Sequence, residues 1–214
     1  MTHTLLAGLA AGLALTANAA AQNAEQTFSH TGFDRIDISG QFEARIEVGE
    51  TWSVQMSGDA DDMDDVRIGT EDGELRVRAR NRWFGNGGDL DVTLVVTMPD
   101  IAAAEFGRGI SADLSGVNAG QFDLEVSTGA SATISGQCTR LEAEVSTGGL
   151  MRARALECGT VAVEASTGGS GDVYASDRVD AEASTGGELD IFGSPRSHSR
   201  ETSFGGSIRI VSGS

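Results

Sequence analysis

The sequence predicts an all-β fold: a solenoid of stacked coils preceded by a half of less regular strands. Ser-Thr-Gly recurs at a nearly constant interval in the second half, and a short run of alternating apolar and polar residues precedes each copy. The composition agrees with this fold. The chain of 214 residues has 29 glycines, two prolines and 5% aromatics, which is typical of many tight turns and thin layers.

The repeat occupies residues 102–214. Its Ser-Thr-Gly serines, which follow one another at nearly equal spacing, are Ser127, Ser146, Ser166 and Ser184. Gly107 extends the series upstream and Ser203 extends it downstream by the same interval, so six coils are expected. A period of about 19 residues without a helix-length segment predicts that each copy is one coil of a stack.

Alternation within a copy assigns the two faces of each strand. Phe122, Leu124 and Val126 are expected to point inward, with Asp123 and Glu125 outward, and later copies keep this phase. Each coil therefore contributes one strand to a narrow core.

A glycine closes each corner of the predicted solenoid. These turn residues are Gly109, Gly129, Gly148, Gly168, Gly186 and Gly205. Their recurrence predicts a positive φ, which glycine adopts readily and other residues resist. The Ser and Thr before them could bond the turn backbone and neighbouring coils. Alternatively, the Ser/Thr column is a ligand-binding face.

Six glutamates precede the corners and form a predicted acidic column, Glu105, Glu125, Glu144, Glu164, Glu182 and Glu201. Stacked about 4.8 Å apart, two unit charges repel by about 0.9 kcal/mol even in bulk water. Two interpretations stay open. The column is a solvated face that blocks aggregation, or it is a weak site for a basic partner or a cation such as Ca²⁺, which favours carboxylate oxygens. No other cofactor is expected.

The two cysteines occupy equivalent places in consecutive coils. Cys138 and Cys158 lie at the same distance before the next turn serine, Ser146 and Ser166 respectively. Stacked positions are close enough for a disulfide, and an exported protein meets oxidising conditions. We expect this bond, with two stacked buried thiols as the alternative.

Residues 33–101 lack the tight period but still alternate in several segments, which predicts an irregular β half. The acidic stretch GDADDMDDV lacks the residue order of an EF-hand loop and is expected to be a short helix or turn. Arg76, Arg78 and Arg80 form a basic strip on one strand face, either solvated or facing the acidic column of a neighbouring molecule.

Residues 1–21 have an apolar stretch followed by small residues, as in a secretory signal peptide, and residues 22–32 are expected to be a flexible mature N-terminus. No segment is apolar and long enough to span a membrane. The net charge of −17 argues against nucleic-acid binding. These features predict a protein exported to the periplasm or the cell surface.

The VTMPD segment at 96–100, the repeated Ser-Thr-Gly copies and the closing GSP and SFGGSIRI segments resemble the putative auto-transporter adhesin head GIN domain family. The resemblance covers residues 33–214. It implies a right-handed single-stranded β-helix, a role in adhesion and no catalytic residues. The family usually has Ser-Gly-Ser-Gly at the turn, whereas this chain has Ser-Thr-Gly.

No enzyme motif emerges independently: G-x-S-x-G and H-E-x-x-H are absent, and only His30 and His198 follow the expected signal. The expected function is that of an exported, non-catalytic interaction module of the cell envelope or surface, whose partner is a protein or glycan. A Ca²⁺-assisted carbohydrate-binding module is the alternative, and a polysaccharide-active enzyme is a weaker one. The unpaired last strand also predicts homo-oligomers.

Overall fold

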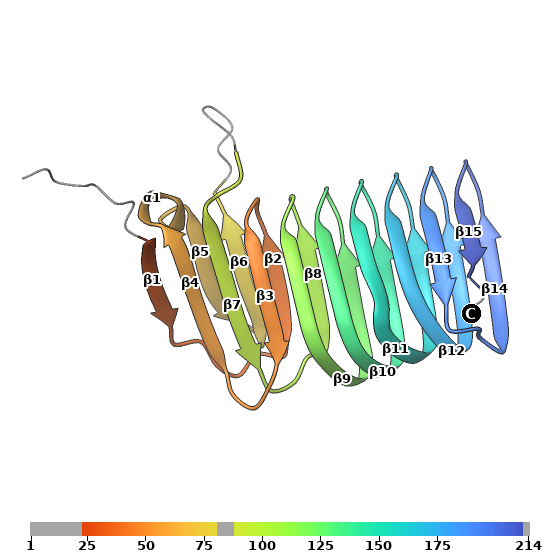
Figure 1. The fold of residues 1–214 in the computed structure, drawn as a ribbon, viewed down its shortest axis with the longest axis horizontal. Helices are drawn as coiled ribbons and strands as arrows, with labels where there is room; N and C mark the ends of the chain where they lie inside the picture. Colours follow the sequence, from red (N-terminus) through yellow and green to blue (C-terminus); the bar gives the residue numbers. More distant parts are fainter. Residues whose placement is uncertain (1–22, 81–87, 212–214) are drawn as a thin grey trace, which may run out of the picture.

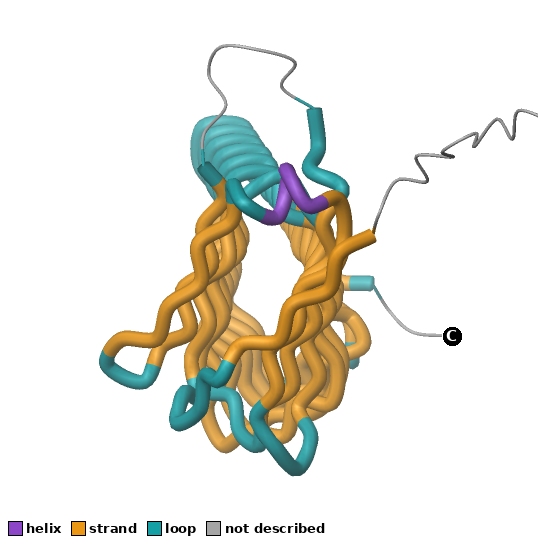
Figure 2. Tube along the Cα trace, turned by 90° about the vertical axis from the view of Figure 1, so that its left-hand side faces the viewer, coloured by secondary structure: helices purple, strands orange, loops and turns teal. Residues whose placement is uncertain are grey.

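The computed structural model describes residues 23–80 and 88–211 as a β-solenoid of about five turns. The strands lie side by side along one long axis (Figure 1). Two sheets face each other across a narrow core, as the end-on view shows (Figure 2). The expected signal peptide, residues 1–21, lies outside the described residues.

The regular part is built from eight strands: β8 (Ala103–Gly107), β9 (Ser111–Val126), β10 (Ser131–Val145), β11 (Leu150–Ala165), β12 (Ser170–Ala183), β13 (Glu188–Phe192), β14 (Ser197–Thr202) and β15 (Ser207–Ile210). The long strands β9 to β12 bend midway, so the first half of each belongs to one sheet and the second half to the other. Parallel pairing in register joins successive coils. The Ser-Thr-Gly copies turn the chain at the opposite edge, at the top of Figure 1.

The first half contains β1 (Asn23–Phe28), β2 (Arg35–Ser39), β3 (Glu43–Val48), β4 (Ser53–Asp59), α1 (Ala60–Met63), β5 (Val66–Glu71), β6 (Glu74–Ala79) and β7 (Val92–Met98). Its strands do not stack in chain order. β2 lies between β6 and β8, while β3 lies between β7 and β9, so the first coil sits inside the stack and a later one lies outside it.

The two sheets can now be defined. Sheet 1 runs β1-β4-β7-β3, then the first halves of β9 to β12, then β13 and β15. Sheet 2 runs β5-β6-β2-β8, then the second halves of β9 to β12, then β14. Most pairs are parallel, but β1, β4 and β5 pair antiparallel with their neighbours at the N-terminal end.

One sequence expectation is wrong here. Residues 23–28, expected within a flexible segment, form strand β1, which pairs with β4 along its whole length. The prediction failed because this stretch carries only Ala24 and Phe28 as apolar residues, too weak a pattern to indicate a strand. Both side chains pack against the hydrophobic core.

The core is a continuous apolar layer between the sheets. Inward positions predicted from the alternation, such as Phe122, Leu141 and Val161, are fully buried. Phe106 and Phe122 are fully buried in the middle of the stack, whereas the inward positions nearer the C-terminus include the small buried side chains of Ala181 and Ala183. Among the described residues, no helix has the length and apolarity required to cross a membrane.

Candidate functional site

The Ser-Thr-Gly corners are tight turns with two consecutive left-handed residues. In the copy at Ser127, the Ala130 N–H donates to the Ser127 carbonyl at 3.1 Å, Thr128 has φ 52° and Gly129 has φ 72°. Positive φ at both central residues is the type I′ pattern. All six turn glycines have positive φ. The residue before each is also left-handed, a feature that sequence reasoning missed: Arg108, Thr128, Thr147, Thr167, Thr185 and Phe204.

Backbone hydrogen bonds join the corners of successive coils. The Gly129 N–H donates to the Thr147 carbonyl of the next coil at 3.1 Å, and the same bond recurs from Gly148 to Thr167 at 3.2 Å. The corners therefore continue the hydrogen-bond ladder of the strands. The exposed Thr side chains are left pointing outward from the edge of the stack.

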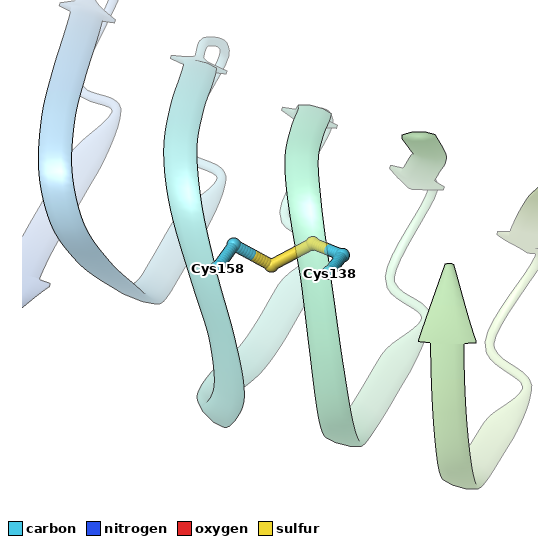
Figure 3. Close-up of a disulfide and its surroundings, with 2 residues drawn as sticks. All are labelled: Cys138 and Cys158. Carbon is cyan, nitrogen blue, oxygen red and sulfur yellow. A yellow bond between two sulfur atoms is a disulfide. The ribbon is translucent and has the colours of Figure 1, made fainter. Parts of the chain in front are cut away.

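The predicted disulfide is present. Cys138 on β10 and Cys158 on β11 are partners in the parallel register, their Cα atoms are 4.5 Å apart, and their sulfurs are bonded. Figure 3 shows the bond joining the two adjacent strands. It fastens two central coils close to the bend between the sheets, and both residues are buried.

The acidic column lies in register on the outer face of sheet 2. Each member pairs with the next across adjacent strands, from Glu105 on β8 to Glu201 on β14. Among the described residues, Glu125, Glu144, Glu164, Glu182 and Glu201 have neither an ion pair nor a side-chain hydrogen bond. Their mutual repulsion can therefore be reduced only by solvent and ions, or by a partner that binds this face.

A second column of carboxylates runs beside the first and is partly neutralised. Arg140 pairs with Glu142 at 2.9 Å, and Arg178 pairs with Asp180 at 2.9 Å, each from two residues earlier on the same strand. The hydrogen bond from Arg178 lowers the pKa of Asp180. The sequence could have indicated these pairs, because residues two apart share a strand face.

The two columns border a groove of about 700 Å³ on sheet 2. Nine carboxylate side chains line it, against two guanidinium groups, those of Arg35 and Arg140. Ala103 and Ala162 hold outward positions in the second column, in line with Asp123 and Glu142, and their small side chains leave room there. We call this surface, with the acidic column along it, the acidic face.

The acidic column is longer than predicted, because Asp37 on β2 lies beside Glu105. Asp37 is 5% exposed and forms a bidentate ion pair with Arg78, which also donates to Ser39. Burial raises the pKa of Glu105, and repulsion from Asp37 and Glu125 adds to the rise. Sequence reasoning missed Asp37 because its strand is inserted out of chain order.

The arginines of the basic strip form ion pairs within the molecule. Arg76 contacts Glu71 at 2.7 Å and Glu74 at 3.2 Å, Arg78 holds Asp37, and Arg80 lies 3.6 Å from Asp65. The structure thus gives these arginines carboxylate partners inside their own chain, whereas the sequence left open a role towards a neighbouring molecule.

The acidic stretch of the first half forms the short helix α1, one of the two alternatives expected for it. Asp59 caps this helix by accepting from the backbone N–H groups of Asp61 and Asp62. Within residues 23–80 and 88–211, no three His, Cys, Asp or Glu side chains converge as they would around one metal ion.

Solved structures of two bacterial proteins have a similar architecture. A crystal structure of a protein from Bacteroides fragilis described as a putative adhesin is similar, with a TM-score of 0.69 and 13% identity over 90% of this chain and 98% of that one. A protein from Parabacteroides distasonis described as a putative lipid binding protein has a TM-score of 0.51 and 14% identity over 88% of this chain and 96% of that one. At these identities the likeness shows the fold alone.

No curated protein matches the sequence closely enough to count as a relative. A family model does match, over residues 32–195, which is most of the described solenoid. By this match, the chain belongs to the family described as putative auto-transporter adhesin, head GIN domain.

Proposed function

We propose that this chain is an exported, non-catalytic interaction module of the cell envelope or surface, and that its acidic face binds a basic segment of a partner protein. The observation that carries the proposal is the groove on sheet 2, with nine carboxylates against two guanidinium groups. The adhesin description of the family supports an interaction role.

The geometry favours a cationic partner for a physical reason. The unpaired glutamates repeat about every 4.8 Å along the stack, so the negative potential of each is reinforced by its neighbours. A helix with one Arg or Lys on the same side in each turn repeats about every 5.4 Å, which is close enough for long, flexible side chains to follow the column. Such a segment would relieve the repulsion that the fold leaves in place.

The test is binding of a labelled oligo-arginine peptide, followed by fluorescence anisotropy at physiological ionic strength. We expect the double variant Glu144→Gln/Glu164→Gln to bind about fivefold more weakly, because two exposed charge contacts contribute roughly 1 kcal/mol together. Binding should also weaken as salt is added, since exposed charges are screened.

The matched control removes two exposed carboxylates from the outer face of sheet 1, in Glu47→Gln/Glu188→Gln. This variant has the same net charge as the first and should keep the affinity of the parent. Equal weakening by both variants would mean that the peptide reads only the net charge of −17, and the proposal for the acidic face would then fail.

A second arm separates the Ca²⁺-assisted carbohydrate alternative. A glycan array is probed with and without Ca²⁺, using the parent chain and the Glu144→Gln/Glu164→Gln variant. A glycan signal that needs Ca²⁺ and is lost in that variant would replace the basic segment as the partner.

A further inference from the structure

The two ends of the solenoid differ in the charged side chains that they leave without a partner in the described part of the chain. At the C-terminal end, residues 194–211 contain three arginines and one glutamate, together with His198; Arg196 and Arg209 pair with Asp177 and Asp190 of the chain itself, and Arg200 is left without such a partner among the described residues. At the N-terminal end, residues 59–65 contain five aspartates and no basic residue. The whole chain is strongly acidic, so this difference in charge is confined to the two ends. At each end, the last of the described strands have a neighbour on one side only.

The C-terminal end shows an unusual choice of residues in β14. His198, Arg200 and Thr202 are in register with Val179, Ala181 and Ala183, which point into the core. All six residues of β14 are exposed because no described strand covers it. Arg200 and His198 have no ion-pair partner among the described residues. A copy that covers β14 must therefore bring a carboxylate within reach of Arg200, or it would leave an unpaired charge buried.

The last turn departs from the other copies at the same end. Phe204 stands where four copies have Thr, it has φ 46°, and it is 87% exposed. A bulky residue in the left-handed region is uncommon, and an aromatic ring left in water gains nothing from burial. Ile208 and Ile210 on β15 are only partly buried, beside the fully packed Leu189 and Ile191. This end combines an open strand edge, exposed apolar groups and an unpaired cation.

The N-terminal end has the complementary features. β1 ends sheet 1 and β5 ends sheet 2, and each has a free edge among the described strands. Helix α1 lies at the corner between the sheets, on the same edge of the stack as the Ser-Thr-Gly turns (Figures 1 and 2). Asp61 and Asp64 are exposed there, and their carboxylates have no partner within the described chain. Asp59, Asp62 and Asp65 already serve as a cap, as an acceptor for the Asp91 N–H and as a partner for Arg80.

We infer that copies of this chain associate head to tail, with the C-terminal end of one against the N-terminal end of the next. β15 then continues sheet 1 onto β1, and β14 continues sheet 2 onto β5. The corners coincide, which brings Phe204 and Arg200 of one copy towards α1 of the next. Charge complementarity selects this arrangement over two like ends, since a symmetric C-terminal contact would oppose Arg200 to Arg200 or His198. A head-to-tail contact leaves a free end on every complex, so growth is open-ended.

The test is sedimentation velocity of the purified chain over a concentration series at physiological ionic strength, where repulsion between the acidic bodies is screened beyond about 8 Å. We expect the average mass to keep rising with concentration. Arg200→Glu should weaken association about tenfold, and Asp61→Arg/Asp64→Arg should do the same, because each places like charges against one another. Combining the three substitutions in one chain should restore association, since the reversed ends are complementary again.

Two further variants guard the interpretation. Phe204→Thr restores the residue of the other copies, so it should leave the melting temperature unchanged or higher while weakening association. Arg108→Glu makes the same charge change as Arg200→Glu at an exposed corner in the middle of the stack, and it should leave association unchanged. Circular dichroism of each variant checks that the fold is kept.

Three outcomes would overturn the inference: a mass that stays monomeric at the highest concentration, a mass that stops at twice the monomer, or a combined variant that fails to regain association. The experiment is independent of the acidic face, because binding of the oligo-arginine peptide can be measured with Arg200→Glu, which leaves the Glu144 and Glu164 region untouched. Failure of one proposal therefore leaves the other standing.

Discussion

At the scale of single residues, the corners require glycine for two different physical reasons. Gly148 has φ 72° and open space where a Cβ would be, so only its backbone conformation demands glycine. Gly149, the next residue, has no such φ, but a Cβ there would lie 2.4 Å from the Val126 carbonyl oxygen. The first requirement is local, while the second comes from the neighbouring coil.

The two glycines should therefore respond differently to alanine. Gly148→Ala should reduce the free energy of unfolding by about 1 kcal/mol, the penalty for a side chain in the left-handed region. Gly149→Ala should cost about 2 kcal/mol or more, because the backbone of the preceding coil must move. Urea denaturation of the two variants provides the comparison. Ala130→Gly is the control, since Ala130 holds the place of Gly149 in the preceding copy, and a larger loss at Gly148 would contradict the argument.

Glu105 makes the stability of the folded chain depend on pH in a defined direction. Its pKa is raised above the ordinary value of 4.5 by burial and by Asp37 and Glu125, with Arg78 opposing. The unfolded chain therefore releases this proton at lower pH than the folded chain does, so ionisation of Glu105 costs folding free energy as pH rises through the raised pKa.

Glu105→Gln should accordingly be more stable than the parent at pH 7. The advantage should shrink as pH falls through the raised pKa towards the ordinary value of 4.5, because the parent regains its proton while glutamine does not titrate. Urea denaturation of both proteins at the two pH values measures the difference, and the subtraction cancels the titration of the other carboxylates. An advantage that grows as pH falls would show that Glu105 is not the group responsible.

At the scale of elements, the disulfide between β10 and β11 closes a loop with a sequence separation of 20 residues. In the chain-entropy model, a loop of this size contributes about 3 kcal/mol by restricting the unfolded state. Cys138→Ala/Cys158→Ala should lose about this amount in guanidinium denaturation and keep the parent circular dichroism spectrum. Reducing the parent with dithiothreitol should bring its midpoint to that of the variant. A variant as stable as the oxidised parent would show that the disulfide does not stabilise the fold.

The elements also show why some features could be predicted and others could not. The coils from β9 to β12 follow from the sequence because each turn repeats the same inward and outward positions, which fixes Cys138 beside Cys158 and Glu144 beside Glu164. The insertion of β2 and β3 inside the stack leaves no periodic mark, because it depends on long-range pairing. The same insertion hid Asp37 as the next carboxylate of the acidic column. The groove could not be foreseen either, since it depends on Ala103 and Ala162 facing outward between charged neighbours.

At the scale of the whole molecule, each coil of a solenoid contacts only its neighbours, so stability is distributed along one axis. The central coils are covered on both sides and two of them share the disulfide. The last coil, β14 and β15, is covered on one side only, and β14 is exposed throughout. Local opening should therefore begin at this end, where few apolar contacts oppose it.

Hydrogen exchange followed by mass spectrometry tests this gradient. In a dilute sample, amides of β14 and β15 should exchange at least about tenfold faster than those of β10 and β11, since opening the last coil breaks contacts with one neighbour only. Raising the protein concentration should slow exchange in β14, β15, β1 and β5 together, because head-to-tail contact covers these four edges and leaves the middle of the stack unchanged. Arg200→Glu should shift this effect to about tenfold higher protein concentration while keeping the gradient itself. Uniform exchange along the stack would contradict the nearest-neighbour view of the fold, and slowing confined to β14 and β15 would point to a symmetric contact between two C-terminal ends.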